Sequence, residues 1–313
     1  MTKNKSNSYL PVILVTGCSS GIGLCLAQLL LPKINYRVVV TARKASLDKI
    51  FEAGLKETDR FLIRELDVSS RSQRSRVVRE IQDLWGGVDI LVNNAGFAYR
   101  SVMEEMDNSS EASQMITNYL GPMSLIRLVL PYMRKCGRGK IISVSSVSGM
   151  LAMPTMGSYS ASKHALQGAS EALWYELKPF GIDVSLVQPG FINSRSFQNV
   201  RYSKKSHIAL TEDGPYSEYY KNMQPFVAKL MAKSRVDSKD VAKTILKVIQ
   251  TQSPRFIVPA TPDAVLFYYI RKILPRRWFQ PLLFYLLPRA RSWAKKHSTA
   301  RPQSFWQKLK RWM

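Results

Sequence analysis

The chain has 313 residues, of which 45% are apolar, so it can form a sizeable core, and its composition argues against global disorder. Its three cysteines, Cys18, Cys25 and Cys136, are irregularly spaced, which argues against a disulfide framework and a zinc site; we expect no metal and a reducing, cytoplasmic compartment. The formal net charge of +24 indicates an anionic partner surface.

Residues 1–9 form a polar N-terminal tail with no apolar stretch, so we expect no signal peptide. Residues 10–260 alternate apolar strands with amphipathic helices, which predicts an α/β fold with a doubly wound, Rossmann-like parallel sheet of about seven strands and helices on both faces. The strands are predicted at Val12–Thr16, Arg37–Thr41, Phe61–Leu66, Ile90–Val92, Lys140–Val144, Asp183–Val187 and Phe256–Val258. Helices are predicted at Ile22–Leu31, Arg71–Leu84, Met115–Met133, Ser158–Lys178 and Ser238–Gln250, the last with Asp237 as its N-cap.

The first predicted strand ends in a glycine-rich turn, Thr16-Gly17-Cys-Ser-Ser-Gly21-Ile-Gly23, and an apolar helix follows. Glycines between a strand and a helix let backbone N–H groups approach a pyrophosphate, and the helix N-terminus adds favourable dipole charge. The alternative is a tight turn with no ligand. In this strand–loop–helix setting the turn predicts dinucleotide binding.

Tyr159 and Lys163 lie one turn apart on the same face of a predicted helix. An ammonium beside a phenol favours the phenolate, so the pair predicts a general acid/base acting on a hydroxyl or carbonyl group. Tyr268 and Lys272 have the same spacing, but only the first pair has a serine, Ser146, thirteen residues ahead in a loop that follows a strand. We therefore interpret Tyr268 as a structural or membrane-facing aromatic residue.

Together these motifs resemble the short-chain dehydrogenase/reductase family, and the resemblance covers nearly all of residues 10–260. The family motifs occur in order: Thr16–Gly23, Asp67-Val68, Asn93-Asn94-Ala95-Gly96, Asn118, Ser146, Tyr159 with Lys163, and Pro189-Gly190. The wording Gly-Cys-Ser-Ser-Gly-Ile-Gly-Leu is most similar to the branch of hydroxysteroid and retinol dehydrogenases.

The resemblance implies a role for each catalytic residue. Tyr159 would exchange the proton with the substrate oxygen, and Lys163 would lower the pKa of the phenol and hold the nicotinamide ribose. Ser146 would hydrogen-bond the substrate oxygen, although Ser145 competes for this role. Asn118 would hold a water that links Lys163 to solvent, although a buried structural amide is an alternative.

The resemblance also implies a set of cofactor contacts. They are Gly17, Ser19, Ser20, Gly21, Ile22, Gly23, Arg43, Asp67, Val68, Asn94, Ala95, Gly96, Tyr159, Lys163, Pro189, Gly190 and Ile192. An acidic residue at the end of the second strand suits NAD, whereas an arginine suits the 2′-phosphate of NADP. Arg43 stands there with no acid beside it, which favours NADP(H) over NAD(H), unless Arg43 is merely a solvated side chain of a basic protein.

Residues 191–235 follow Pro189-Gly190 and correspond to the family's mobile lid. The aromatic content of this stretch predicts a bulky apolar alcohol or ketone as substrate, but ordinary helix packing explains the same side chains. Ser194 stands where the family often has threonine, and His207 is interpreted as a surface residue. The aromatic and methionine residues on which this prediction rests are Phe197, Tyr202, Tyr216, Tyr219, Tyr220, Met223 and Phe226.

Residues 261–313 form a basic amphipathic C-terminal extension. From Pro254 to Met313, 13 Lys and Arg residues stand against one acid, Asp263, and four of the six tryptophans lie here. Two apolar segments, 264–274 and 278–287, are too short to span a membrane but suit docking on an anionic membrane surface. Packing of these segments on the enzyme is the alternative. We expect no nucleic-acid partner, because no recognition motif accompanies the charge.

The sequence thus predicts an NADP(H)-dependent oxidoreductase that interconverts a hydroxyl and a carbonyl group on a lipophilic substrate, such as a steroid, a retinoid or a long-chain compound. The resemblance implies a homodimer, and the tail implies peripheral membrane contact. The rival hypothesis is a non-catalytic dinucleotide-binding redox sensor or membrane scaffold. A binder needs no proton donor, so the intact set of Asn118, Ser146, Tyr159 and Lys163 favours the enzyme.

Overall fold

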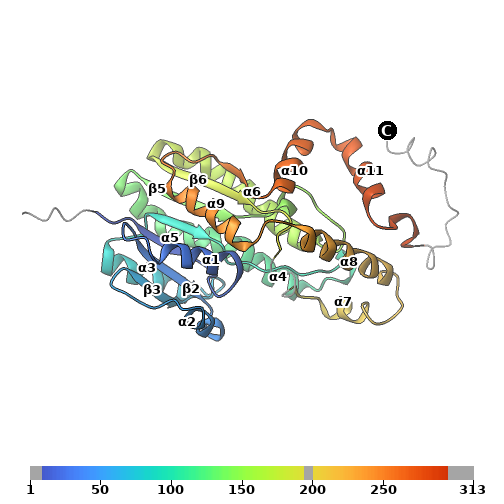
Figure 1. Ribbon diagram of the computed structural model, residues 1–313, viewed down its shortest axis with the longest axis horizontal. Helices are drawn as coiled ribbons and strands as arrows, with labels where there is room; N and C mark the ends of the chain where they lie inside the picture. The colour runs from blue at the N-terminus through green and yellow to red at the C-terminus, as the bar shows by residue number, and fades with distance from the viewer. Residues whose placement is uncertain (1–8, 194–199, 295–313) are drawn as a thin grey trace, which may run out of the picture.

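Seven parallel strands form the central sheet, and their order in space is β3-β2-β1-β4-β5-β6-β7. The strands are β1 (Val12–Val15), β2 (Arg37–Ala42), β3 (Phe61–Glu65), β4 (Ile90–Asn93), β5 (Gly139–Val144), β6 (Ile182–Gln188) and β7 (Ile257–Pro259). Each predicted strand is present, and the bounds differ by one residue or less at either end. The computed structural model describes residues 9–193 and 200–294 (Figure 1), so Ser194, Phe197, Trp306 and Trp312 lie outside the described residues.

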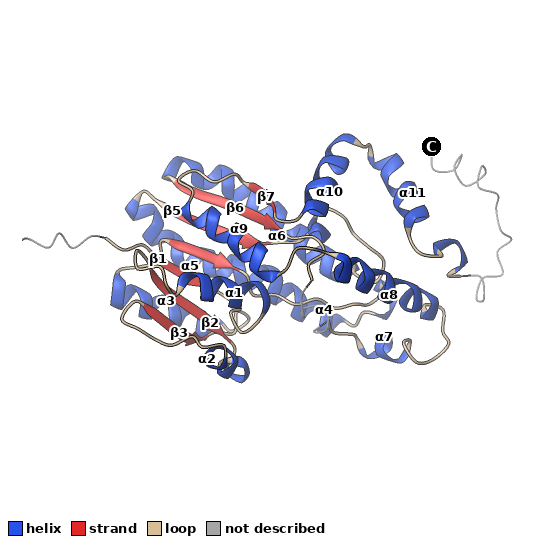
Figure 2. Cartoon of the chain, viewed as in Figure 1, coloured by secondary structure: helices blue, strands red, loops and turns tan. Residues whose placement is uncertain are grey.

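The helices cover both faces of this sheet (Figure 2), as the alternating sequence predicts. They are α1 (Gly21–Leu30), α2 (Asp48–Glu52), α3 (Arg71–Trp85), α4 (Asn108–Met115), α5 (Gly121–Cys136), α6 (Gly157–Leu177), α7 (Lys204–Ile208), α8 (Ser217–Lys233), α9 (Ser238–Gln250), α10 (Pro262–Ile273) and α11 (Arg276–Leu286). The expected N-cap is confirmed, because the Asp237 side chain accepts hydrogen bonds from the backbone N–H groups of Lys239 and Asp240.

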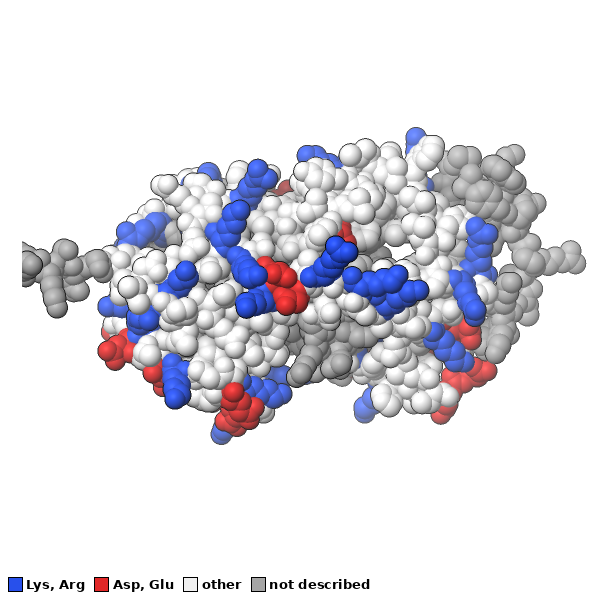
Figure 3. Space-filling model, viewed as in Figure 1, with Lys and Arg blue, Asp and Glu red and all other residues white. Residues whose placement is uncertain are grey.

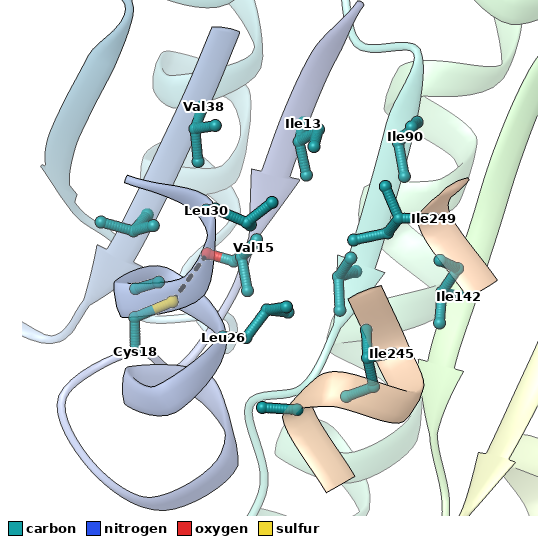
Figure 4. Packing of buried hydrophobic residues seen from close by; sticks show 14 of the residues in the cluster. Ile13, Val15, Cys18, Leu26, Leu30, Val38, Ile90, Ile142, Ile245 and Ile249 are labelled. Atoms are coloured by element: carbon teal, nitrogen blue, oxygen red, sulfur yellow. Dashed lines mark hydrogen bonds between the residues drawn. The ribbon is translucent and has the colours of Figure 1, made fainter. Parts of the chain in front are cut away.

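Two apolar clusters lie on opposite faces of the sheet because successive strand residues point in opposite directions. Ile13 and Val15 of β1 pack with α1 and α9, whereas Val12 and Leu14 pack with residues of α3, α5 and α6. Figure 4 shows the first cluster, where Ile245 and Ile249 of α9 lie beside β4 and β5 and Leu26 and Leu30 of α1 lie beside β1. The strands are therefore buried on both faces, which holds their carboxyl ends in fixed register.

The predicted helix over residues 115–133 is longer and less regular than expected. It begins at Asn108 with Asp107 as N-cap, and a π-helical segment, Ile116–Leu120, joins α4 to α5. At the start of α5, a Cβ on Gly121 would lie 2.6 Å from the carbonyl oxygen of Val68, so only glycine fits there. The wider π turn is common at functional sites, and here it contains the buried residue Asn118.

The start of the C-terminal extension forms two short helices, α10 and α11, which project from the body as an arm beyond β7 (Figure 1). The arm leads from the end of the sheet back toward the end of α8. Pro262 lies in the first turn of α10, Pro275 is the N-cap of α11, and Pro281 lies inside α11. None of the described helices has the length and apolarity that a bilayer span requires.

Candidate active site

The loops after β1 and β4 are joined at the carboxyl edge of the sheet, where the strand order changes direction. The Thr16 hydroxyl oxygen accepts hydrogen bonds from the backbone N–H groups of Asn94 and Ala95, both at 3.0 Å. The Asn94 side chain donates in return to the carbonyl oxygens of Thr16 and Gly17, at 2.9 and 3.0 Å. Ligands of open α/β sheets bind at this switch point, so the two loops form a preorganised cradle.

Glycines make the cradle tight enough for the backbone to reach a ligand. Gly17 has a φ of +73°, and a Cβ there would lie 2.7 Å from the Cα of Ala95. A Cβ on Gly23 would collide with the carbonyl oxygen of Gly17, so α1 packs closely against the end of β1 only because residue 23 is glycine. The arrangement has the close helix–strand packing of a dinucleotide site.

The N-terminus of α1 opens toward this cradle. Ser20 is the N-cap and is exposed, yet its side chain makes no capping hydrogen bond with the described residues. Gly21 follows with a φ of +55°, while Ser19 and Ile22 are partly exposed. Uncapped N–H groups and the helix dipole suit a phosphate, so the residues present fit the pyrophosphate of a dinucleotide.

Arg43, Asp67 and Val68 extend the cradle along the same sheet edge. The register pairs Ala42 of β2 with Glu65 of β3, so Arg43 and the Asp67-Val68 pair follow neighbouring strand ends. Arg43 is exposed, and the Asp67 carboxylate accepts hydrogen bonds from the backbone N–H and the hydroxyl of Ser69. The structure thus brings the predicted adenosine side of the cofactor site together at one edge.

Tyr159 and Lys163 lie in the first two turns of α6, beside the end of β5. The Lys163 ammonium donates to the carbonyl oxygen of Val144 at 2.9 Å and lies 5.8 Å from the centre of the Tyr159 ring. Ser146 follows β5 and is a hydrogen-bond partner of the Tyr159 phenol. Ser145, the competing serine, is buried and accepts a hydrogen bond from Gln167, so the structure brings Ser146 to the phenol.

The protonation properties of this pair follow from burial. Burial raises the pKa of the Tyr159 phenol, and the hydrogen bond with Ser146 opposes that rise only in part. Burial also lowers the pKa of Lys163 to about 8. The predicted lowering of the Tyr159 pKa by Lys163 is wrong for these side-chain positions, because the ammonium is directed at Val144.

Asn118 joins two parts of the site through its side-chain amide. Its amide oxygen accepts from the backbone N–H of Phe97 at 3.1 Å, and its amide nitrogen donates to the carbonyl oxygen of Phe97 and to Ser162. A Cβ on Gly96 would lie 3.1 Å from the Asn118 amide oxygen and 3.7 Å from the Lys163 nitrogen. The loop after β4 therefore adjoins both Asn118 and Lys163, and the alternative of a structural amide is consistent with these bonds.

The Pro189-Gly190 loop after β6 borders the same site. The carbonyl oxygen of Pro189 accepts from the backbone N–H of Val147, next to Ser146, at 2.8 Å. The loop is held from below by the start of α10, because Gly190 N–H donates to the Thr261 hydroxyl and Phe191 N–H donates to the Asp263 carboxylate. Ile192 is buried, and any side chain at residue 190 would collide with Asp263.

An apolar cavity of about 60 Å³ lies beside Val147 and Ser148, which follow Ser146 in the loop after β5. Typical ligand pockets have volumes of about 300–1,000 Å³, so a bulky substrate requires this wall to move. Arg100 is the charged side chain among the lining residues, and it is 3% exposed. The lining residues are Arg100, Val147, Ser148, Leu151, Met153, Met156, Phe191, Val227 and Phe267.

The lid aromatics pack mainly with one another. Tyr220 is 1% exposed, accepts a hydrogen bond from the Val102 backbone and donates to Glu105, and Tyr219 stacks on Trp293 at 4.6 Å between ring centres. Phe191 and Val227 of the lid stretch line the cavity, but none of the other described aromatic or methionine residues predicted for the lid does, so helix packing explains those residues better than substrate contact. His207 is exposed on α7, as expected.

Sequence patterns missed part of the cavity wall. Phe267 belongs to α10, which we assigned to the extension, and Met153 and Met156 lie in an irregular loop. Arg100 follows the Asn-Asn-Ala-Gly motif, but one more arginine carries no signal in a chain with 46 Lys and Arg residues. Among the described residues, no group of His, Cys, Asp or Glu could hold a metal ion.

The region that matches known proteins includes the candidate active site. A family model described as short chain dehydrogenase matches residues 11–205, which include the glycine loop and the Tyr159–Lys163 helix. The chain is 34% identical over 272 residues to a 3-ketodihydrosphingosine reductase of Bacteroides thetaiotaomicron, covering 86% of this chain and 95% of that one. It is 33% identical over 248 residues to retinol dehydrogenase 8 of Homo sapiens, covering 77% and 78%. A solved short-chain dehydrogenase from Streptomyces avermitilis matches with a TM-score of 0.71 at 29% identity, covering 88% of this chain and 99% of that one.

Proposed function

The chain belongs to the short-chain dehydrogenase/reductase family of oxidoreductases, and we propose that it uses NADP(H) to interconvert a hydroxyl and a carbonyl group on a lipophilic substrate. The observation that carries this proposal is the meeting of Ser146, Tyr159 and Lys163 at the carboxyl end of β5, beside the glycine-built cradle. The nicotinamide supplies or accepts the hydride when it is bound.

Tyr159 and Ser146 would handle the substrate oxygen. In the reducing direction the Tyr159 hydroxyl donates its proton to the carbonyl oxygen, which becomes the alcohol. The Ser146 hydroxyl donates a hydrogen bond to the same oxygen, where negative charge develops. The Tyr159 phenol is protonated at neutral pH and can donate in this direction, and the hydrogen bond with Ser146, which opposes the rise in its pKa on burial, favours release of the proton.

Lys163 would return a proton to Tyr159. With a pKa of about 8, its ammonium is mostly protonated at neutral pH and loses a proton more readily than an ordinary lysine. Asn118 lies against the loop that also adjoins Lys163, so we propose that it supports the water path that reprotonates Lys163. Its side-chain bonds to Phe97 and Ser162 would fix the π turn for this purpose.

The preference for NADP(H) rests on charge at the end of β2. Arg43 is exposed at the cradle's edge, and the sequence offers no acid at the end of that strand. A 2′-phosphate gains from an arginine there, whereas the 2′-hydroxyl of NAD is usually held by an acid. The remaining predicted contacts, from Gly17 to Ile192, are shared by both cofactors.

The lipophilic substrate class rests on the cavity wall. Methionine, valine, leucine and phenylalanine side chains make up most of the lining, and such walls select apolar ligands. The two named relatives, a 3-ketodihydrosphingosine reductase and a retinol dehydrogenase, bear the names of long apolar compounds. We therefore place a long-chain ketone or alcohol, a retinoid or a steroid in this pocket.

Two partners besides the substrate complete the proposal. A second copy of the chain would pair through the side of α6, where Tyr175 is 62% exposed. An anionic membrane surface would contact the C-terminal extension. This extension is basic, and its described part, residues 261–294, is basic as well. Figure 3 shows Lys and Arg side chains spread over the visible face with fewer acidic ones between them.

A Tyr159→Phe variant tests the proposal against the rival of a non-catalytic binder. We expect turnover of hydrophobic ketones to fall by about 10²–10⁴-fold, because the proton donor is lost, while the Kd for NADPH stays near the wild-type value. Tyr268→Phe is the matched control, since Tyr268 has the same spacing to a lysine but lies on α10. Turnover that survives Tyr159→Phe would exclude the proposed chemistry.

A further inference from the structure

The arm formed by α10 and α11 exposes an unusual number of large apolar side chains. Of the eighteen such residues exposed in the described part of the chain, eight lie on these two helices. On α10 the most exposed is Ile273, at 77%, and on α11 it is Leu286, at 64%. We define the docking face as Val265, Leu266, Tyr269, Ile273, Trp278, Leu282, Phe284 and Leu286. A concentrated apolar surface of this kind marks an interaction site.

Most of these residues form one stripe on each helix. Leu266, Tyr269 and Ile273 lie three and four residues apart, as do Trp278, Leu282 and Leu286 at intervals of four. The two helices of the arm pack against each other, since Phe279 of α11 is 3% exposed and Arg271 of α10 lies over its ring at 5.3 Å. The exposed stripes therefore lie outside this contact.

The charges around the docking face are of one sign. Residues 261–294 contain six Lys and Arg residues and a single acid, Asp263. That acid accepts a hydrogen bond from Phe191 and faces the loop after β6, so it does not offset the cations. Lys272 and Arg277 are exposed beside the apolar stripes. An open hollow of about 260 Å³ at the end of α11 adds Arg289 and Arg291 next to apolar side chains.

Both ends of the arm are attached to the walls of the substrate pocket. At its start, Thr261 and Asp263 hold the backbone of Gly190 and Phe191, and Phe267 of α10 lines the cavity itself. At its end, Trp293 is buried against Tyr219 and the apolar side chains of the α8 lid helix. The docking face thus lies on the element that closes the pocket.

We propose that the docking face binds the surface of an anionic lipid bilayer, and that the substrate pocket opens beside this contact so that a lipophilic substrate enters from the lipid. Exposed apolar stripes with a tryptophan and flanking cations are the chemistry that an anionic interface recognises. The helices have 12 and 11 residues, so they lie on a bilayer rather than cross it. The docking stands on this surface alone, whereas the entry route rests also on the proposed function.

Co-sedimentation with vesicles tests the docking directly. Full-length protein is mixed with vesicles of phosphatidylcholine alone or of phosphatidylcholine with phosphatidylglycerol. We expect wild type to sediment with the anionic vesicles and the double variant Ile273→Asp/Leu286→Asp to bind at least tenfold more weakly. Ile34→Asp is the matched control, because Ile34 is 75% exposed in a turn far from the arm. Equal binding of the double variant and wild type would overturn the docking.

A second set of variants separates charge from apolar contact. Lys272→Gln/Arg277→Gln should weaken binding to the anionic vesicles severalfold. The loss of affinity should be larger at low salt than at high salt, because salt screens the charges. Lys56→Gln/Arg79→Gln removes the same charge from exposed positions on α3 and the loop before β3 and should bind as wild type does. If the docking-face variants instead change a dimer into a monomer and leave vesicle binding intact, the face belongs to a second copy of the chain and the membrane proposal is wrong.

Turnover tests the entry route. With a long-chain ketone embedded in anionic vesicles, we expect Ile273→Asp/Leu286→Asp to lower kcat/KM about as much as it lowers binding. With a short, water-soluble ketone, its kcat/KM should equal that of wild type. Wild-type turnover of the embedded ketone by a variant that no longer sediments would overturn the entry route. Absence of turnover with every ketone would reject the proposed function and the entry route together, while the docking is decided by sedimentation alone.

Discussion

The loops that hold the cofactor side and the helices that wall the substrate side are fixed in different ways. The loops after β1 and β4 are locked by backbone contacts, namely the hydrogen bonds between Thr16 and Asn94 and the close approach of Gly17 and Gly23. The substrate wall is held by side-chain packing between segments far apart in sequence, such as Trp293 on Tyr219. A backbone-built site fits one ligand shape, whereas a packed wall can shift as a unit.

The rigid cradle and the packed wall should respond differently to their ligands. The cofactor is the same in every turnover, so a rigid cradle does not restrict the range of substrates. Rigidity also lowers the entropy lost when the cofactor binds. The apolar cavity of about 60 Å³ must widen to admit a bulky substrate. Substitutions on the two sides should therefore act on different kinetic constants.

Lys163 belongs to both sides, so its replacement should have the largest effect. Lys163→Met should lower kcat by about 10²–10⁴-fold, because the proton supply to Tyr159 is lost. The Lys163→Met protein should be more stable than wild type at neutral pH, because a buried cation is removed. Chemical denaturation of both proteins across pH measures this.

The sign of that pH dependence follows from the pKa of Lys163. The folded pKa of about 8 lies below the ordinary value of about 10.4, so the unfolded chain binds more protons between these two values. The stability of wild type relative to Lys163→Met should therefore rise as the pH increases from about 8 to about 10.4 and stay flat below about 8. A difference that stays flat over the whole range would show that Lys163 is not titrating in this window.

Gly23→Ala tests the rigid cradle and should have the next largest effect. The new Cβ collides with the carbonyl oxygen of Gly17, so we expect a loss of about 1–3 kcal/mol in the free energy of unfolding and a higher KM for NADPH. Gly168→Ala is the control, because its Cβ would have no neighbour within 4 Å. That substitution on α6 should raise stability by up to about 1 kcal/mol. Equal melting temperatures for the two variants would contradict the close packing.

Phe267→Ala tests the packed wall. The variant removes an aromatic side chain that α10 contributes to the cavity, and the loss of apolar contact should raise KM for a bulky ketone by about tenfold. KM for NADPH should be unchanged. Ile34→Ala is the control, since Ile34 is 75% exposed and belongs to neither the cavity nor the docking face. A matched rise in both cofactor and ketone KM would mean that the two sides are not independent.

Arg43→Ala should have the smallest effect, because its side chain is exposed. KM for NADPH should rise by about three- to tenfold, and the change should shrink at high ionic strength because surface charges are screened. KM for NADH should be unaffected. Steady-state rates with both cofactors measure the outcome, and a wild-type preference for NADH would refute the cofactor assignment.

The sheet was predictable from sequence because its strands are buried on both faces. Val12–Val15 and the three successive valines of β2 are apolar and mostly β-branched runs, and the helices between the strands have marked starts, as at Asp237. The glycine turn after β1 and the Tyr159–Lys163 pair were predictable for a related reason, because each consists of residues close together in sequence. The π turn at Ile116–Leu120 was not predicted, because a single turn with one extra residue does not change the spacing of apolar residues enough to be recognised.

The substrate wall was not predictable in the same way. Phe267, Met153 and Arg100 meet only because the chain returns across more than one hundred residues, and none of them belongs to a local motif. The lid aromatics gave a misleading signal. An aromatic residue such as Tyr220 has the same sequence pattern whether it packs between helices or lines a pocket. The altered pKa of Tyr159 was also beyond the sequence, since it depends on burial and on where the Lys163 ammonium points.

The bonds from Thr261 and Asp263 to the loop after β6 bear on how this protein can be cut or recombined. A chimera joined after residue 260 would remove both acceptors and leave the amides of Gly190 and Phe191 unpaired, which costs about 1–3 kcal/mol for each buried group. It would also remove the Phe267 ring from the cavity. A graft that exchanges only the α11 half of the docking face should instead place its junction after Leu274, so that Thr261, Asp263 and Phe267 are all kept.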